Sequence, residues 1–463
     1  MNLSSPLLLA TAAVTDETYT KAVITALLIT AGMIFVLSTL LGELCSRLNL
    51  PTVLGDLTTG ILLGGSLLGV FVLTDGSEGI NAPLLRAIGW LTNAPPETVV
   101  NAYRFQMRDF FSNSASIGLL SLLFVTGMES DLKELIKVGS QAATVALTGV
   151  LLPLVGGTVA LVYGFHVPVI PAIFAGAALT ATSIGITAKV LQEMGKLQSK
   201  EGQIILGAAI LDDILGIVIL ALALSLIETG SIELTAIIVL IVKAAAFILL
   251  AFILNRYFCP LFSSRIESFD NPAALVLFAL AFLNLLALVA IGLGLEALLG
   301  AFAAGLVLGG TRQKEKLLQL MQPFVFVYTT VFFVTIGASV NLDVLNPLEP
   351  KNWSGLVIAA GLIAIAITGK IAAGFTVFGD GATGAATGGK AINRLAVGTG
   401  MIPRGEVGLV FAGLGASTGA LSDSLDAAII IMVVVTTVVA PLLLRWVFPS
   451  EPETSNSGAA EPV

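Results

Sequence analysis

Two adjacent aspartates, Asp212 and Asp213, stand in the middle of a long apolar run at residues 202–226. Placing an ionisable side chain inside a hydrocarbon layer costs free energy, so a functional role is the first interpretation, and a partner that pairs with the charge is expected. Neighbouring residues on a helix project about 100° apart, so both carboxylates can line one cavity edge without sharing a single proton. Desolvation and mutual repulsion favour the protonated form of at least one of them. A proton and a small cation, which suits hard oxygen ligands, would then compete for the same oxygens. A purely structural polar pair is the alternative.

A lysine in a second apolar run can balance this charge. Lys370 lies deep in the run at 353–378, too far from either end for its amino group to reach water comfortably. It is therefore the natural ion-pair partner of an aspartate. Lys243 also falls inside an apolar run, and nothing in the sequence explains it.

Polar residues and glycines interrupt two further runs. Thr182 and Ser183 stand at the centre of 167–191, and Pro403-Arg404-Gly405-Glu406 stands within 391–418. Unwound backbone at membrane depth is tolerated only where it is buried or lines a watery cavity. Half-helix ends there expose partial charges that Arg404 and Glu406 can neutralise, and free carbonyls can bind a cation. A simple proline kink is the plainer alternative.

The composition sets the class of protein that carries these residues. The chain has 463 residues, 56% of them hydrophobic and 11% charged, with a mean hydropathy of +0.99, whereas soluble domains carry about a quarter charged residues. A net charge of -8 argues against a nucleic-acid surface. Cys45, Cys259 and His166 show no metal-ligand or disulfide pattern, and the N-terminus lacks the basic start of a secretory signal.

The apolar runs predict an all-α integral membrane protein with about thirteen transmembrane helices. The predicted spans are 21–42, 51–73, 114–128, 138–163, 167–191, 202–226, 234–253, 271–292, 295–310, 323–340, 353–378, 391–418 and 425–448. With the N-terminus outside and the C-terminus in the cytoplasm, most Lys and Arg fall in cytoplasmic segments, as expected.

Two pairs of similar segments indicate an internal repeat. Residues 53–65 match 298–310 at every glycine, and Phe124-Val125-Thr126 matches Phe333-Val334-Thr335. The first pair lies in the second and ninth spans, which run in opposite directions if seven crossings separate them. We therefore predict an inverted repeat, the plan of many secondary transporters. Packing of small residues could produce the same glycine pattern.

The stretch from Ala181 to Asp213 and the Pro403-Arg404-Gly405-Glu406 motif resemble the monovalent cation:proton antiporter-2 family, close to NapA-type sodium/proton antiporters. The resemblance covers about 37–448 and implies an NhaA/NapA-like inverted repeat with two crossed discontinuous helices. It implies a homodimer in a lipid bilayer that exchanges a monovalent cation for H+. The membrane would be the inner membrane of a prokaryote, or the thylakoid membrane in a cyanobacterium.

The resemblance also implies domains within an antiporter unit at 1–448. We expect a core domain with spans near 114–228 and 323–418, and a dimerisation domain near 21–73 and 234–310 with adjoining helices. An extracytoplasmic loop at 74–113 and a disordered cytoplasmic tail at 449–463 complete the prediction. Because the chain ends soon after its last span, we expect no nucleotide-binding regulatory domain of the kind found in Kef-type relatives.

Residue roles follow from the resemblance position by position. Asp213 would bind the proton and the transported Na+, and Asp212 would be the partner of Lys370. Thr182 and Ser183 would lie at the crossing of the broken helices, with Arg404 and Glu406. No cofactor is expected beyond the transported Na+ and H+.

Several alternatives stay open from the sequence. Na+, Li+ and K+ all use oxygen ligands, so a K+/H+ antiporter and a cation-coupled symporter of an organic anion remain rivals. An intramembrane aspartyl protease is disfavoured, because its two carboxylates must come from separate helices to face one water. Lys370 as a second proton carrier would make exchange electrogenic, whereas a lysine that never deprotonates would not.

Overall fold

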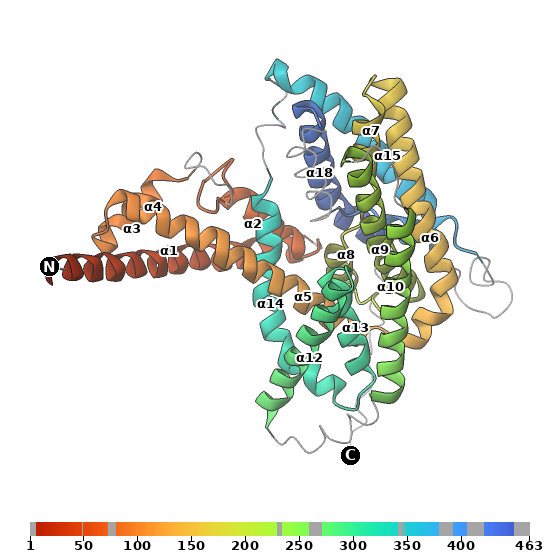
Figure 1. The fold of residues 1–463 in the computed structure, drawn as a ribbon, viewed down its shortest axis with the longest axis horizontal. Coiled ribbons are helices and arrows are strands. Elements are labelled where there is room, and N and C mark those ends of the chain that lie inside the picture. Colours follow the sequence, from red (N-terminus) through yellow and green to blue (C-terminus); the bar gives the residue numbers. More distant parts are fainter. Residues whose placement is uncertain are drawn as a thin grey trace, which may run out of the picture.

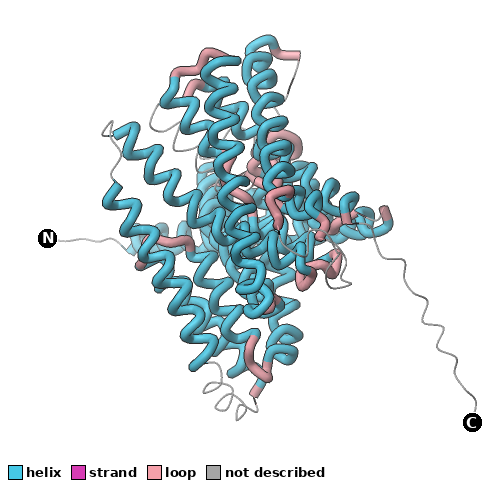
Figure 2. Tube along the Cα trace, turned by 90° about the vertical axis from the view of Figure 1, so that its right-hand side faces the viewer, coloured by secondary structure: helices cyan, strands magenta, loops and turns pink. Residues whose placement is uncertain are grey.

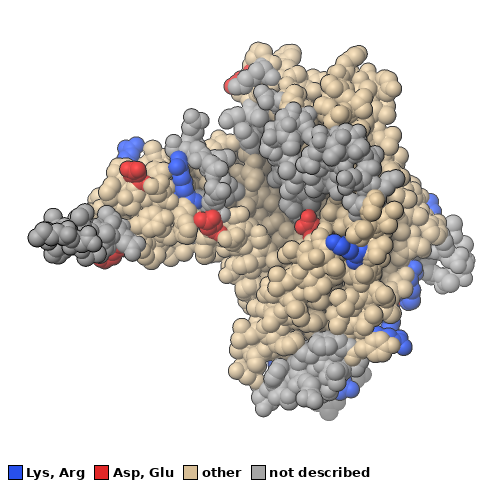
Figure 3. Space-filling view, viewed as in Figure 1, with Lys and Arg blue, Asp and Glu red and all other residues tan. Residues whose placement is uncertain are grey.

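The computed structural model describes residues 6–48, 50–72, 80–228, 234–258, 271–340, 346, 348–378, 392–404 and 421–448. Within these residues the chain is helical, and the only pairing of extended backbone is an isolated bridge between Gly64 and Phe71. Figure 2 shows helices throughout this part of the chain. On the face shown in Figure 3 the described surface carries few charged side chains, as a surface in contact with lipid requires.

In the described part of the chain, nine helices are long and apolar enough to cross a membrane. They are α1 (Pro6–Arg47), the run Pro96–Glu129, α6 (Leu132–Val159) with η2 (Ala160–Gly164), α9 (Lys200–Glu228), α10 (Leu234–Ile253) with η3 (Leu254–Phe258), α12 (Pro272–Gly292), α14 (Lys314–Ala338), α15 (Trp353–Gly374) and α18 (Asp423–Val447). The all-α membrane class is confirmed.

The other predicted spans correspond to shorter helices. These are α2 (Val53–Leu63), α7 (Val169–Ala178), α8 (Ile184–Glu193), α13 (Ala297–Gly309) and α16 (Arg394–Gly400). A short helix cannot cross the hydrocarbon layer alone, so each of these must be packed among longer neighbours. The total of thirteen spans stays a prediction.

The segment predicted as a loop at 74–113 is largely helical from Ala82 onward. It contains α3 (Ala82–Thr92), and then α4 (Pro96–Phe105) and η1 (Gln106–Phe111), which continue into α5 (Ser112–Glu129). Helix α5 thus begins two residues before the predicted start of the third span at 114, and the helical run extends back to Pro96. The polar residues of this segment belong to the amphipathic helix α4, which the apolar runs did not indicate. Its Tyr103 is fully buried, and the hydroxyl donates to the Val70 carbonyl at 2.7 Å and accepts from the Val72 amide at 3.2 Å.

Helices α2, α5, α13 and α14 form one packed group, to which α1 and α12 are attached. Glycines allow the closest approaches: a Cβ at Gly60 would lie 2.1 Å from the Val334 carbonyl oxygen, and one at Gly305 would lie 1.9 Å from that of Phe124. Gly60 and Gly305 occupy matching positions in the two similar segments. The equivalent packing of α2 on α14 and of α13 on α5 is what a twofold-related repeat predicts, and the opposite orientation of the halves stays a prediction.

A second group consists of α6, α7, α9, α15, α16 and α18, and α8 lies between the two groups, in contact with both. Figure 1 shows α6, α9 and α15 on one side of the molecule and α1, α3 and α4 on the other. The grouping differs from the division drawn from the sequence, because α5 and α14 pack with the first group and α18 packs with the second. Helices are grouped by complementary surfaces, here the glycine contacts of α5 and α14, and not by their order along the chain.

We predict that Gly305→Ala lowers the melting temperature of the purified protein. The added methyl group would overlap the α5 backbone, and overpacking a tight contact costs about 1–3 kcal/mol. Gly292→Ala is the matched control, because a Cβ there meets nothing within 4 Å. Thermal unfolding in detergent measures both variants, and equal melting temperatures would contradict the close packing of α13 on α5.

Candidate functional site

A buried ion pair joins α9 to α15. The Lys370 Nζ lies 3.1 Å from Asp212 Oδ1 and 3.3 Å from Oδ2, and both side chains are inaccessible to solvent. In a low-dielectric interior each charge is costly unless the other is present. The pair predicted from the sequence therefore forms in the structure, and it fixes these two helices to each other.

Helix α6 provides the room that this lysine needs. It packs against both α9 and α15, and a Cβ at Gly149 would lie 3.3 Å from both Cδ and Nζ of Lys370. Gly149 therefore leaves the space through which the lysine passes to Asp212. Nothing in the sequence indicated this role, since Gly149 is one of several glycines in an apolar run.

The interruption predicted in the fifth span lies between α7 and α8, at residues 179–183. It meets the end of α16, after which Met401 to Arg404 are not helical. Three hydrogen bonds join the two breaks: the Ser183 amide donates to the Pro403 carbonyl at 2.8 Å, Thr182 Oγ1 to that of Met401 at 3.1 Å, and Thr187 Oγ1 to that of Gly400 at 2.8 Å. The break between α7 and α8 therefore lies against the end of α16, and each satisfies backbone groups of the other. Sequence reasoning missed the part played by Thr187.

Arg404 lies fully buried at this contact. Its Nη1 donates to the carbonyls of Thr180 at 2.9 Å and Ala181 at 2.5 Å, just beyond the C-terminal end of α7. A cation there offsets the partial negative charge of a helix C-terminus. The Arg404 carbonyl in turn accepts from Thr437 of α18, a partner that the sequence did not reveal. Glu406 lies outside the described residues.

Asp213 follows Asp212 on α9 and is 7% exposed, whereas Asp212 is not exposed at all. The charges of Asp213 and Arg404 both act on Lys370, so the three elements α9, α15 and the segment that follows α16 place their charges in one region. Among the described residues no group of three or more His, Cys, Asp or Glu side chains could hold a resident metal ion. The arrangement places one nearly buried carboxylate, Asp213, next to a fully buried ion pair.

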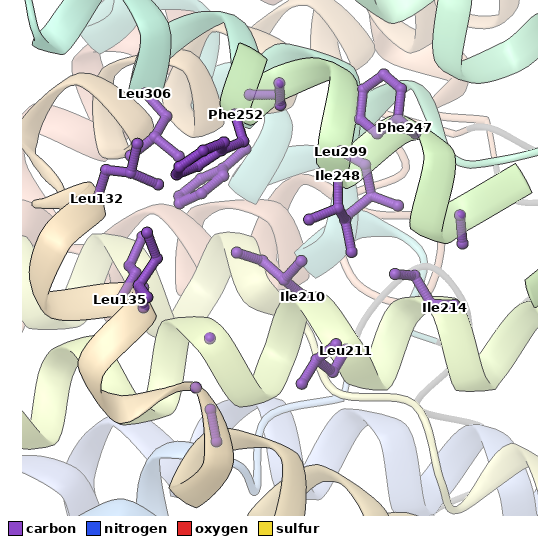
Figure 4. A pocket seen from close by; sticks show the side chains of 18 of the residues that line it. Leu132, Leu135, Ile210, Leu211, Ile214, Phe247, Ile248, Phe252, Leu299 and Leu306 are labelled. Atoms are coloured by element: carbon purple, nitrogen blue, oxygen red, sulfur yellow. The ribbon is translucent and has the colours of Figure 1, made fainter. Parts of the chain in front are cut away.

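An apolar groove lies beside α9 on the side of α10 and α13. Its volume is about 270 Å³, and Leu132, Ile210, Ile214, Phe247 and Leu299 are among the residues that line it. Figure 4 shows these side chains converging from α6, α9, α10 and α13. The groove therefore lies between α6 and α9 of the second group and α13 of the first, with α10 alongside.

Comparison with known proteins agrees with this geometry. The family model described as "Sodium/hydrogen exchanger, transmembrane" matches residues 32–449. The high-affinity Na+/H+ antiporter NhaS3 of Synechocystis sp. is 46% identical over 95% of this chain and 94% of its own length. The Na+/H+-K+ antiporter GerN of Bacillus cereus is 32% identical over 90% of this chain and 95% of its own.

The fold is also similar to a solved structure, that of the sodium proton antiporter MjNhaP1 from Methanocaldococcus jannaschii. The TM-score is 0.58 at 18% identity, and the match covers 90% of this chain and 96% of the other. Within its described residues, this helical membrane protein, with a buried ion pair near the break between α7 and α8, has the fold of that antiporter. The chain belongs to the sodium/hydrogen exchanger family, the class that the sequence motifs indicated.

We predict that Lys370→Gln destabilises the protein more than the double variant Asp212→Asn, Lys370→Gln does. The single change leaves a buried carboxylate without its partner, at a cost of up to about 3–5 kcal/mol, whereas the double change removes both charges. Thermal unfolding of both variants in detergent measures the difference. A double variant that is less stable than Lys370→Gln would contradict the predicted pairing of the two charges.

Proposed function

We propose that the protein is a secondary transporter that exchanges a monovalent cation, Na+ in the first place, for H+ by alternating access. The observation that carries the proposal is the buried Asp212–Lys370 pair, next to Asp213 on α9 and close to the charge of Arg404. The names of the relatives support Na+, and the name of GerN keeps K+ as the second candidate.

Asp213 is the proposed carrier of the cation and the proton. Both aspartates are buried, but Asp213 is 7% exposed while Asp212 is not exposed and is paired with Lys370, so an arriving ion would reach Asp213 first. A bound cation excludes the proton, and a bound proton removes the charge that holds the cation. This competition couples the two fluxes through one side chain.

The remaining site residues support Asp213. Asp212 is held by Lys370, so it contributes negative charge without being open to solvent. Thr182 and Ser183 hold the crossing in place through their bonds to Met401 and Pro403. Arg404 neutralises the end of α7, and the resemblance assigns Glu406 to the same crossing.

We further propose which parts move. The group of α6 to α9 with α15, α16 and α18 carries the site and would move as the core domain, while α1, α2, α5 and α12 to α14 would form the fixed, dimerising part. The apolar groove at α10 and α13 supports this division, because it offers no polar contacts to break. The orientation proposed is that with the N-terminus outside and the cytoplasmic tail at 449–463.

Asp213→Asn is expected to abolish exchange, because an amide can neither release a proton nor offer a full negative charge to the cation. Reconstituted vesicles with an imposed pH gradient, tested with Na+, Li+ and K+ in turn, measure both activity and selectivity. Glu97→Gln, which changes an exposed carboxylate of α4, is the control. Exchange at the wild-type rate by the Asp213→Asn protein would refute the assignment.

Exchange is proposed to move net charge, two protons for one cation. Among the described residues of the site, the negative charges of Asp212 and ionised Asp213 are balanced by the positive charges of Lys370 and Arg404. An entering cation therefore adds one positive charge that nothing balances in this buried region. Loss of the Lys370 proton restores neutrality, and Asp213 releases the other proton. An inside-negative potential would then favour cation extrusion by about 2.3 kcal/mol per net charge per 100 mV.

Clamping the membrane potential of proteoliposomes with a potassium ionophore tests this stoichiometry with Na+ as the cation. We expect both the rate and the end point of exchange to change with the potential. If neither changes, exchange is electroneutral and Lys370 is a fixed counter-charge. Lys370→Gln separates the two roles further, because a variant that exchanges without a voltage response identifies the lysine as the second proton carrier.

A further inference from the structure

The apolar groove beside α9 opens on the outer surface of the protein, between α6 and α10. Ile136 of α6 and Ile248 and Phe252 of α10 line it, and these side chains are 57%, 48% and 39% exposed. Farther in, the lining residues Ala142 and Leu299 are buried. The groove therefore leads from the surface toward α9 and α13, where the two helix groups face each other.

The surface around this opening is one that lipid covers. Helix α10 with η3 is long and apolar enough to cross a membrane, and only 11% of its most apolar stretch is buried inside the protein. Water gains no hydrogen bonds from an apolar wall, so an apolar cavity of about 150 Å³ stays dry and takes up hydrocarbon instead. A larger apolar groove that is open to lipid is filled by hydrocarbon for the same reason.

The size of the groove determines what kind of hydrocarbon enters it. A helix with its side chains is about 10–12 Å across, which is too wide for a groove of about 270 Å³. A second copy of this chain could therefore cover the opening but could not fill the groove. A single unbranched acyl chain can fill it, because rotation about each carbon–carbon bond lets the chain follow the walls.

One end of the groove lies next to an arginine. Figure 4 shows the side chains of Phe252 and Leu306 at this end, where Asn255 Nδ2 donates to the Leu306 carbonyl at 3.0 Å. Arg256 follows Phe252 by about one helical turn. Arg256 is exposed, and its Cζ lies 5.9 Å from the centroid of the Tyr257 ring. Among the described residues it forms no ion pair.

The start of α6, whose first residue lines the same end of the groove, contributes no net charge. Its four charged residues are two acids and two lysines, Asp131, Lys133, Glu134 and Lys137, and the last two of them form an ion pair. The guanidinium of Arg256 is thus a positive charge that these neighbours do not balance. A ligand with an apolar chain and a negative group at one end matches both the groove and this charge.

We propose that the groove binds an anionic phospholipid, with one acyl chain between α6, α9, α10 and α13 and the phosphate at Arg256. Basic residues beside membrane helices on the cytoplasmic side recognise anionic headgroups, and the orientation proposed above places Arg256 on that side. The acyl chain fills space between the two helix groups that side chains leave open. Any role of this lipid in transport rests on the proposed function, but its binding does not.

The test measures phospholipid binding to the delipidated full-length protein in detergent, with phosphatidylglycerol as the probe and native mass spectrometry as the readout. We expect one tightly bound phosphatidylglycerol per chain. Gly139→Leu should lose it: Gly139 lines the groove, and a Cβ there meets nothing within 4 Å, so the leucine takes the space of the acyl chain. Gly32→Leu, at a glycine of α1 with equally open space, is the matched control and should keep the lipid.

Arg256→Gln tests the contact with the phosphate. This variant should bind phosphatidylglycerol several-fold more weakly than the wild type, while Arg86→Gln, at an exposed arginine of α3, should bind it equally well. Phosphatidylcholine, in which the choline offsets the phosphate charge, should bind the wild type more weakly than phosphatidylglycerol does.

A wild-type protein that holds no lipid tightly, or a Gly139→Leu protein that holds as much as the wild type, overturns the proposal. Equal affinities of Arg256→Gln and the wild type overturn the assignment of the headgroup. Should Gly139→Leu fail to fold, Ala251→Phe narrows the same groove from α10 and is judged in the same way. Asp213→Asn should bind the lipid like the wild type, so a failure of the exchange mechanism and a failure of the lipid site are separate results.

Discussion

The cost of placing charge in a low-dielectric interior is the constraint on which the rest of this structure depends. Asp212 and Lys370 are inaccessible to solvent, so each is tolerated only because the other is within 3.1 Å. The pair requires α9 and α15 to keep their register, and it requires the bare backbone at Gly149 of α6. The ion pair thereby fixes α6, α9 and α15 relative to one another. Asp213, the next residue on α9, is held in place with them.

The contact between the break at residues 179–183 and the segment that follows α16 obeys the same constraint for backbone groups. Breaking α7 from α8 exposes carbonyls and amides that hydrocarbon cannot satisfy, and the Arg404 guanidinium and the Ser183–Pro403 bond satisfy them. Polar atoms are therefore concentrated where three helical elements meet. The outer surfaces of the same helices carry aliphatic side chains. These polar groups are in this way surrounded by apolar side chains.

Packing is tighter within the helix groups than between them. Glycines let α2 approach α14, and α13 approach α5, at backbone distance, which favours a rigid frame. Between α9 and α13 the apolar groove leaves about 270 Å³ unfilled. Polar contact between the groups is concentrated at α8, where Glu193 binds Thr52 and Gln192 binds Glu129 at 3.1 Å. Tight packing within the groups and loose packing between them suit a mechanism in which one group moves relative to the other.

The sequence by itself determined the class of protein, because hydropathy and intramembrane charge are local properties of the chain. It was enough to predict the all-α membrane fold, the Asp212–Lys370 pair and the break at Thr182 and Ser183. The roles of Gly149, Thr187 and Thr437, and the grouping of α5 and α14 with α2 and α13, were decided only by the tertiary structure. The helical run from Pro96 was also missed, since Tyr103 is buried through contacts with Val70 and Val72 that lie far away in the sequence. Which surfaces meet depends on shape complementarity between distant segments, and residue types along one segment do not contain that information.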